Sequence, residues 1–450
     1  IWQTVWCEFV PAAGYITKLL PVADIKNNRV LIKPEANVLD RTEILQVNVV
    51  INVNQSKNCQ FKNRISKTGS IGRFIPVKIP SECLLLWSPE EPSLYSLQAQ
   101  LLNSKGEVVD SVDSYFAMRE ISSGFDDKGV PRPMLNSKFV FHVGTLDQGF
   151  WPDGIYTPPT DEALQYDIKA HKEMGFNMIR KHVKVEMKRW YYHCDRLGIL
   201  VWQDIPAVVK QHPQSSAGEF LDEAERIVKM LSFHPSIVLW TVYNEGWGQP
   251  SDELATAAIT AKLRGIDPTR LINSLSGINF NAVKPNYDIG VGSSIDIHHY
   301  PEPGRVKYND FRFSVAGEYG GISYYIKDHS WDFKRCHGYG PDVESADKLI
   351  TAYQNYQNQV GEISEGDSYG ISASVYTEIT DVETECNGLL TYDRIFKVEA
   401  RKIYNINKQL VDKYAERFQQ TDTDTSTTDE HGLNRDPVTK ESGLFELKFF

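Results

Sequence analysis

Residues 1–118 show the alternation of apolar and polar positions that is typical of β-strands with one buried face. In the clearest run, the polar residues Gln46, Asn48 and Asn52 lie between apolar residues, which are Leu45, Val47, Val49, Ile51 and Val53. A second alternating run, over residues 97–101, leads into the turn sequence Asn103–Gly106 and returns through Val108 and Val109, which predicts a β-hairpin. Short strands at this spacing predict a small β-sandwich.

From about residue 136 the pattern changes to short apolar runs that alternate with segments of helical periodicity. The apolar runs predict eight strands, at Phe139–Val143, Asn177–Arg180, Ile199–Asp204, Ile237–Asn244, Leu271–Ser274, Ile295–His298, Phe313–Ala316 and Ile371–Tyr376. Between them, apolar residues from Phe220 to Leu231 recur at helical spacing. Eight such repeats predict a (β/α)8 TIM barrel over residues 119–415, and a doubly wound open sheet is the competing architecture.

The C-terminal segment, residues 416–450, is rich in threonine and acidic residues, and this composition predicts a disordered tail. The rest of the chain has the composition of a globular protein, with 41% hydrophobic and 24% charged residues among 450. No apolar run approaches the roughly 18 residues of a membrane span, so no membrane association is expected. We therefore expect a multidomain β plus α/β protein.

The net charge of −11 argues against nucleic acid as a partner and favours a neutral or cationic ligand. Six cysteines lie far apart without a CxxC motif, which predicts buried thiols rather than a disulfide framework or a zinc site. The chain begins at Ile1 without methionine or a leader, which indicates a processed or incomplete product. The compartment stays open, with a secreted or periplasmic location favoured.

Two glutamates follow predicted barrel strands at the end where TIM barrels place their active sites. Glu245 follows Ile237–Asn244, the fourth predicted strand, and Glu318 follows Phe313–Ala316, the seventh. A carboxylate pair across a barrel mouth suits glycoside hydrolysis, in which one group protonates the leaving oxygen and the other attacks or activates water. The sequence therefore points to a glycosidase.

Several segments resemble glycoside hydrolase family 2. Those of the barrel are FNMIRKH at 176–182, ILVWQDIP at 199–206, HPSIVLW at 234–240, NEGWG at 244–248, GEYGG at 317–321 and TEITDVETECNGLLTYDR at 377–394. IWQTVW at the start of the chain and LWSP at 86–89 are similar to the start and an inner strand of the immunoglobulin-like sandwich of that family. The resemblance covers about residues 1–415. It implies an immunoglobulin-like β-sandwich at 1–118 followed by the TIM barrel.

The resemblance also implies a retaining exo-β-glycosidase in which Glu245 is the acid/base and Glu318 the nucleophile. Retention requires the two carboxyl groups to lie about 5–5.5 Å apart. Arg180 is the cation expected beside Glu318, and Asn244 is expected to bond the 2-hydroxyl of the sugar. Trp240 and Trp247 are candidates for an apolar wall that raises the pKa of Glu245.

Further residues are candidate ligands of the sugar. His182 and Asp204 are either hydroxyl ligands or structural residues, and Tyr300 is expected to bond the nucleophile, as the resemblance implies. Three aromatic residues either stack on a sugar or belong to the core, namely Trp151, Trp202 and Tyr376. Adjacent His298 and His299 would point to opposite faces of a strand, so we expect neither a metal nor a cofactor.

The sequence departs from the family pattern in ways that bear on its substrate. The lectin-like jelly-roll domain that the family carries before the sandwich is expected to be missing. The Asn-x-Lys element by which β-glucuronidases of the family hold a carboxylate is not seen near residues 387–389, which disfavours glucuronides. Gln203-Asp204 resembles the mannosidase and glucosaminidase branches. The alternatives are a catalytically silent, carbohydrate-binding relative and a metal-dependent hydrolase, and self-association is left open.

Overall fold

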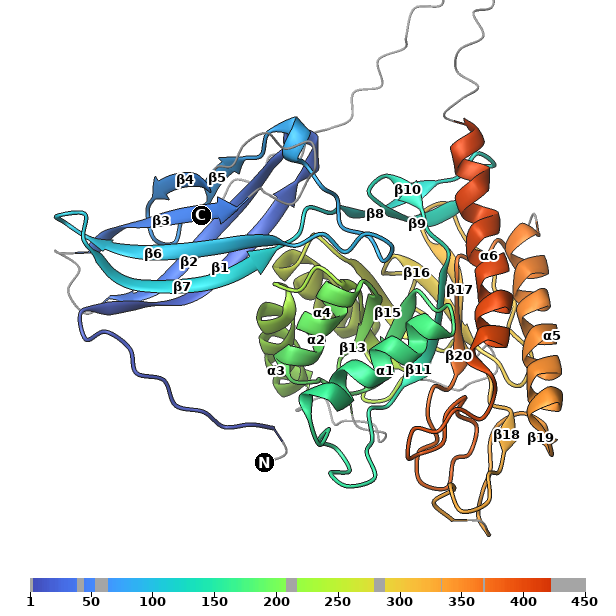
Figure 1. Cartoon of the computed structure of the whole chain (residues 1–450). Coiled ribbons are helices and arrows are strands. Elements are labelled where there is room, and N and C mark those ends of the chain that lie inside the picture. The colour runs from blue at the N-terminus through green and yellow to red at the C-terminus, as the bar shows by residue number, and fades with distance from the viewer. Residues whose placement is uncertain are drawn as a thin grey trace, which may run out of the picture.

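The computed structural model describes residues 3–38, 44–52, 64–207, 217–278, 288–332, 334–366 and 369–421. A β-sandwich at the N-terminal end is followed by an α/β barrel (Figure 1). One sheet of the sandwich has the order β1-β2-β5 and the other β4-β3-β6-β7. The strands are β1 (Gly14–Asp24), β2 (Arg29–Val38), β3 (Ile44–Asn52), β4 (Arg64–Gly69), β5 (Ile75–Lys78), β6 (Tyr95–Asn103) and β7 (Val108–Phe116).

The alternating pattern predicts these strands because one face of each sheet packs into a shared core. Val47, Val49 and Ile51 of β3 are fully buried in that core, against residues of β2 and β6. The predicted hairpin is confirmed, since β6 and β7 pair in antiparallel register across the Asn103–Gly106 turn.

A small antiparallel sheet connects the sandwich to the barrel and consists of β8 (Ile121–Phe125), β9 (Pro131–Leu135) and β10 (Lys138–Phe139). The prediction that residues 86–89 form an inner strand of the sandwich is wrong. Leu86 makes only an isolated bridge to Met118, and fully buried Trp87 packs among residues at the start of the barrel strands. Its indole nitrogen donates a hydrogen bond to the carbonyl of Asp195 at 2.8 Å. Trp87 therefore closes the amino end of the barrel.

Eight parallel strands form the barrel, and their order is β15-β14-β13-β12-β11-β20-β17-β16. They are β11 (His142–Asp147), β12 (Met178–Lys181), β13 (Leu200–Asp204), β14 (Ile237–Asn244), β15 (Leu271–Ser276), β16 (Ser294–His298), β17 (Phe313–Gly320) and β20 (Ala373–Thr377). The first strand pairs with the last, which confirms the barrel and rules out the doubly wound sheet. The ring is nearly closed between β15 and β16, where Ile278 bridges to Ile297.

Most predicted strands agree with the structure within three residues, but the first and the seventh differ. Phe139 belongs to the β10 hairpin, and the first barrel strand begins only at His142. The seventh strand continues to Gly320, so Glu318 lies within it rather than after it. Gly317 has no side chain at a point where a Cβ atom would collide with the carboxylate of Asp296. The glycine thus lets two neighbouring strands approach each other directly below Glu318.

Helices cover the outside of the barrel (Figure 1). They are α1 (Asp161–Glu173), α2 (Lys188–Leu197), α3 (Ala217–Leu231), α4 (Glu253–Ile266), α5 (Ala346–Glu365) and α6 (Ala400–Thr421). The stripe predicted from Phe220 to Leu231 is the buried face of α3. Residues 416–421 of the predicted tail are helical, and residues 422–450 lie outside the described residues. Among the described helices, none is both long and apolar enough to cross a membrane.

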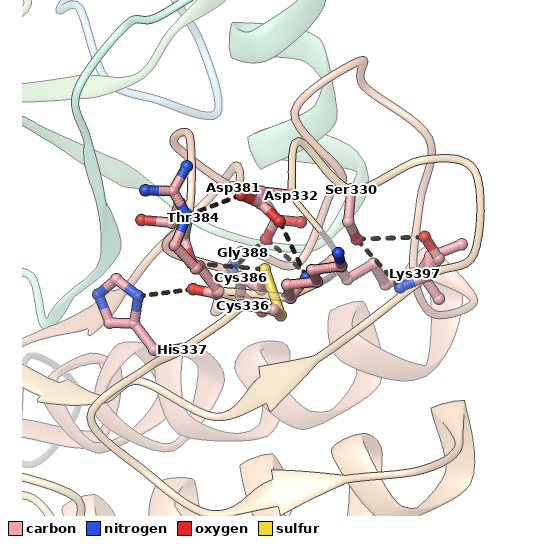
Figure 2. Close-up of a disulfide and its surroundings, with 12 residues drawn as sticks. Ser330, Asp332, Cys336, His337, Asp381, Thr384, Cys386, Gly388 and Lys397 are labelled. Carbon is pink, nitrogen blue, oxygen red and sulfur yellow. Dashed lines mark hydrogen bonds and ion pairs between the residues drawn. A yellow bond between two sulfur atoms is a disulfide. The ribbon is translucent and has the colours of Figure 1, made fainter.

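A disulfide joins two loops at the carboxyl end of the barrel, where buried thiols were expected (Figure 2). Cys336 pairs with Cys386, with their Cα atoms 5.5 Å apart, and Cys83 of the sandwich is also disulfide-bonded. The amide of Cys386 donates a hydrogen bond to the carbonyl of His337 at 2.7 Å. Beside the disulfide, Lys397 forms a buried ion pair with Asp381 at 2.6 Å. The loop after β17 is therefore covalently fixed to the loop after β20.

Arg119 connects the end of the sandwich to the amino end of the barrel. Its buried guanidinium donates hydrogen bonds to the backbone carbonyls of Pro235 at 2.9 Å, Ile237 at 3.0 Å and Thr269 at 3.1 Å. Backbone carbonyls that are buried without a donor cost free energy, so this side chain stabilises the junction.

We predict that Arg119→Met lowers the free energy of unfolding by about 3 kcal/mol or more, because three hydrogen bonds from a charged donor are lost together. Urea denaturation followed by tryptophan fluorescence measures the change, and Arg73→Met, at an exposed arginine, is the matched control. Equal midpoints for the two variants would show that the junction does not depend on Arg119.

Candidate active site

Polar side chains from four barrel strands meet at the carboxyl end of the barrel around the guanidinium of Arg180. Arg180 on β12 is fully buried and donates to both carboxylate oxygens of Asp204 on β13, at 3.2 and 3.0 Å. It also donates to the amide oxygen of Asn244 on β14 at 2.7 Å and to Oε1 of Glu318 on β17 at 2.9 Å. The structure thus brings together four residues that the sequence predicted for the site.

Glu318 is held from two sides and is only 6% exposed. The hydroxyl of Tyr300 donates to its Oε2 at 2.7 Å, and this hydroxyl also lies 2.8 Å from Oγ1 of Thr377. Burial acts to raise the pKa of Glu318, but the positive charges of His298 and Arg180 outweigh burial and lower the pKa below its usual value. Glu318 is therefore kept ionised, as a nucleophile must be.

Glu245 lies directly after β14 in a left-handed backbone conformation, with φ of 49°. Its amide donates to the carbonyl of Ser276 at 2.7 Å, which fixes this turn to the end of β15. Its side chain is 36% exposed, far more than that of Glu318. One oxygen of each glutamate and a ring nitrogen of His298 lie within 4.8 Å of one another. The two carboxylates therefore face a common space.

His298 lies between the two carboxylates, although the sequence predicted no role for it at the site. Its Nδ1 is 2.9 Å from Oε1 of Glu245 and 3.4 Å from Oε2 of Glu318. Burial acts to lower the pKa of His298, but the charge of Glu318 and the hydrogen bond to Glu245 outweigh it and raise the pKa. The alternation of polar and apolar residues along β16 could have predicted this position. Asp296 and His298 lie on one face of the strand, and Ile295 and Ile297 lie on the other.

The atoms of Glu245, His298 and Glu318 are also close enough to hold a metal ion, in the part of the chain that the structure describes. A coordinating histidine nitrogen must be free of its proton, whereas the raised pKa of His298 favours a proton on the ring. A protonated His298 would not serve as a metal ligand at this position. The expected absence of a metal stays a prediction.

Asp204 completes the support of Arg180. Its Oδ2 lies 3.2 Å from Nδ1 of His182, whose ring is 5.9 Å from that of Trp247. Burial acts to raise the pKa of Asp204, but Arg180 outweighs burial and lowers the pKa to about 2. Asp204 is buried, while His182 is partly exposed, so His182 is the one of the two that remains accessible to a ligand.

The predicted sugar-stacking residues do not line an open platform. Trp202 and Tyr376 are fully buried in the core, so sugar stacking at these two positions is wrong. Trp151 is partly exposed, but the guanidinium of Arg394 covers one face of its ring at 3.8 Å. Trp240 packs among the helices with its indole nitrogen bonded to Asp267, so it forms no wall beside Glu245. Trp247 remains a candidate.

Acidic and aromatic groups near the end of β20 were not predicted from the sequence. Glu378 is fully buried, and Gln148 donates to its Oε2 at 3.1 Å. Burial, followed by the charge of Glu385, raises the pKa of Glu378 well above its usual value. Burial also raises the pKa of Glu385, to whose Oε1 Asn387 donates at 2.9 Å. Tyr339, on the loop that the disulfide fixes, lies 4.8 Å from the ring of Tyr300.

Family models match both parts of the chain. The model described as glycosyl hydrolases family 2 matches residues 23–119, and that of the family 2 TIM barrel domain matches residues 159–289. Together they cover about half of the chain. Arg180, Asp204, Asn244 and Glu245 lie within the second match, whereas Tyr300 and Glu318 lie beyond it.

Curated relatives include a β-galactosidase of Enterobacter cloacae, which is 30% identical over 226 residues, or 47% of this chain and 20% of that protein. A β-galactosidase of Lactococcus lactis is 29% identical over 174 residues, or 36% of this chain and 17% of that protein. The alignments therefore span about a fifth of the curated relatives.

Solved structures share the fold at low identity. The β-glucuronidase of Lactobacillus rhamnosus has a TM-score of 0.68 and 16% identity, and the match covers 89% of this chain and 69% of that one. The β-galacturonidase of Eisenbergiella tayi has a TM-score of 0.66 and 16% identity, with 89% of this chain and 73% of that one covered. With the sandwich, the barrel and the two family models in agreement, the chain belongs to glycoside hydrolase family 2.

Proposed function

We propose that the protein is a retaining exo-β-glycosidase that hydrolyses terminal β-linked sugars by double displacement. The observation that carries the proposal is the approach of Glu245, His298 and Glu318 within 4.8 Å of one another at the barrel mouth. Retaining glycosidases have their carboxyl groups about 5–5.5 Å apart, whereas inverting enzymes leave about 6.5–9.5 Å for a water molecule. The short separation supports retention.

In the first step, Glu318 attacks the anomeric carbon while Glu245 donates its proton to the departing glycosidic oxygen. The bond between carbon and oxygen breaks, the aglycone leaves as an alcohol, and a glycosyl ester forms on Glu318. In the second step, Glu245 takes a proton from water, and the hydroxide equivalent displaces Glu318. Atoms and charge balance, since the proton lost in the first step returns in the second.

The surroundings of each carboxylate support these roles. Arg180 and Tyr300 keep Glu318 ionised and fix its orientation, so it meets the anomeric carbon without reorganisation. Glu245 is the more exposed of the pair and can reach a leaving group. Its hydrogen bond with the ring of His298 fixes the orientation of its carboxyl group at the barrel mouth. Asn244, fixed by Arg180, is positioned to contact the 2-hydroxyl.

We further propose that the terminal sugar is neutral. A uronic acid would bring a carboxylate to a mouth that already holds Glu245, Glu318 and the partly buried Glu385. Like charges at close range are unfavourable, particularly where solvent is scarce. The absence of an Asn-x-Lys element near residues 387–389 agrees with this preference. The relatives named β-galactosidase agree with a neutral hexose, whereas others are named putative β-glucuronidases, and mannose and related sugars remain alternatives.

A secreted or periplasmic location is part of the proposal. Disulfides persist mainly in oxidising compartments, and both Cys83 and the pair of Cys336 and Cys386 are disulfide-bonded.

The first test is release of nitrophenol from aryl β-glycosides of galactose, mannose, glucose, N-acetylglucosamine and glucuronic acid. We expect turnover of a neutral sugar and none of the glucuronide, and Glu318→Gln should lower kcat by about a thousandfold or more. Glu362→Gln, on the exposed face of α5, is the matched control. No turnover of any sugar would identify a silent or purely binding relative, and unchanged activity in Glu318→Gln would refute the nucleophile.

The role of Glu245 predicts that its loss depends on the leaving group. Glu245→Gln should reduce kcat/KM for an alkyl β-glycoside by about 10²- to 10⁴-fold, the usual contribution of a general acid. A dinitrophenyl glycoside should lose much less, because its leaving group departs without a proton. Steady-state kinetics on the two substrates measures the ratio, and equal losses would contradict the acid role.

The hydrogen bond from Tyr300 to Glu318 predicts a change in pH dependence. This bond helps to lower the pKa of Glu318, so Tyr300→Phe should raise that pKa and move the acid limb of kcat/KM to higher pH. Tyr325→Phe, at an exposed tyrosine, should leave the limb in place. An acid limb that stays unchanged or moves to lower pH in Tyr300→Phe would count against an ionised Glu318.

A further inference from the structure

A second cavity lies away from the carboxyl ends of the barrel strands, between the sandwich and the helices of the barrel. It has a volume of about 1040 Å³ and is lined by β1 and β7 of the sandwich, by α2 and by the C-terminal part of α3 with the residues that follow it. The N-terminal arm, which Figure 1 draws in dark blue, contributes Trp6 to one side. None of the candidate active-site residues lines this cavity.

Aromatic rings form a fixed cluster in the cavity. The ring of Tyr115 meets those of Tyr192 and Phe233 edge to face, with centroids 5.3 and 4.8 Å apart. The hydroxyl of Tyr115 donates to the buried carboxylate of Asp195 at 2.7 Å, which holds the ring in place. Tyr192 keeps 38% of its surface exposed. The cavity therefore offers rigid aromatic surface that needs little reordering on binding.

The charges around the cavity are opposite in sign to those of the chain as a whole. Its lining includes four basic side chains and two acidic ones, whereas the chain carries a net charge of −11. The basic residues are Lys18, Lys188, Arg189 and Lys229, and the acidic ones are Asp113 and Asp161. Asp161 is already engaged by His193 at 2.9 Å and by Arg189 at 3.5 Å. The cavity thus has an excess of positive charge.

Among these four basic side chains, that of Lys18 is the most buried. Its Nζ donates to the backbone carbonyl of Lys229 at 3.0 Å, which keeps the charge at the cavity. Partial burial lowers the pKa of Lys18. The negative charge of Glu35 acts to raise this pKa, and the positive charges of Lys33, Lys229 and Lys188 act to lower it. An anion bound here would relieve this repulsion.

We propose that this cavity binds an anionic carbohydrate, in which carboxylate or sulfate groups meet the lysines and sugar faces pack on Tyr192 and its neighbours. Binding pockets for small molecules usually measure about 300–1,000 Å³, so this cavity can accept several sugar units. Aromatic surface suits the apolar face of a sugar, and the basic side chains select acidic sugars over neutral ones. The inference rests on this second cavity and on the family of the chain, not on the proposed hydrolysis.

Isothermal titration calorimetry tests the proposal with three tetrasaccharides: oligogalacturonate, a sulfated oligosaccharide and a neutral one. We expect at least one acidic probe to bind, to weaken as the salt concentration rises, and to bind at least tenfold more tightly than the neutral probe. Comparison of the first two probes distinguishes a carboxylate ligand from a sulfate ligand.

Variants locate the binding. Lys188→Glu with Lys229→Glu should weaken binding of the acidic probe at least tenfold, and Tyr192→Ala should weaken it without any change in charge. Lys105→Glu with Lys307→Glu, at exposed lysines outside the cavity, carries the same charge change and should bind normally. All four lysines replaced in the two charge variants are exposed, so both variants are expected to fold. Circular dichroism checks that they do.

Three results would overturn the proposal. The first is the absence of binding for both acidic probes at millimolar concentration. The second is equal weakening in the cavity variant and in the control variant, which would indicate a general charge effect. The third is loss of binding in Glu318→Gln, which would place the ligand in the active site. Binding that persists in Glu318→Gln supports the second cavity, whether or not the chain hydrolyses any sugar.

Discussion

The buried positive charge of Arg180 is the constraint on which the candidate active site depends. A fully buried guanidinium is costly unless its donors are all engaged by charged or polar partners. Asp204, Asn244 and Glu318 meet this requirement from three other strands of the barrel. Because these residues come from β12, β13, β14 and β17, the site exists only where the barrel brings these four strands together. The same contacts that offset the burial of the charge also keep Glu318 ionised.

The two ends of the barrel are stabilised by different means. At the amino end, Trp87 and Arg119 close the barrel with apolar packing and with hydrogen bonds to backbone carbonyls. At the carboxyl end, polar and charged groups are concentrated, and the disulfide between Cys336 and Cys386 fixes the loops that surround them. This division agrees with the general behaviour of TIM barrels, in which one end serves stability and the other carries the chemistry. It explains why a charged site is tolerated on so apolar a scaffold.

The sequence predicted the repeating units and most of the polar site well, because both depend on local patterns. Strand ends pointed to Glu245 and Glu318, and the family resemblance added Arg180, Asn244 and Tyr300. Predictions failed where the outcome depended on distant packing. Trp202 and Tyr376 look like stacking residues in the sequence, but which way a barrel residue faces depends on the register of its neighbours. The pairing of Cys336 with Cys386 likewise depends on two loops 50 residues apart in the chain.

Retaining hydrolysis requires Glu318 to form a covalent bond with the sugar, and mass spectrometry can detect this bond. Incubation of the protein with a panel of 2-deoxy-2-fluoro-β-glycosyl fluorides, followed by mass spectrometry of the intact chain and its peptides, detects the glycosyl ester. We expect the mass of one fluorosugar to be added to the peptide that contains Glu318, and no addition in Glu318→Gln. A label on another residue, or a label that persists in the variant, would contradict the assigned nucleophile. No label with any member of the panel would contradict retaining catalysis by this chain.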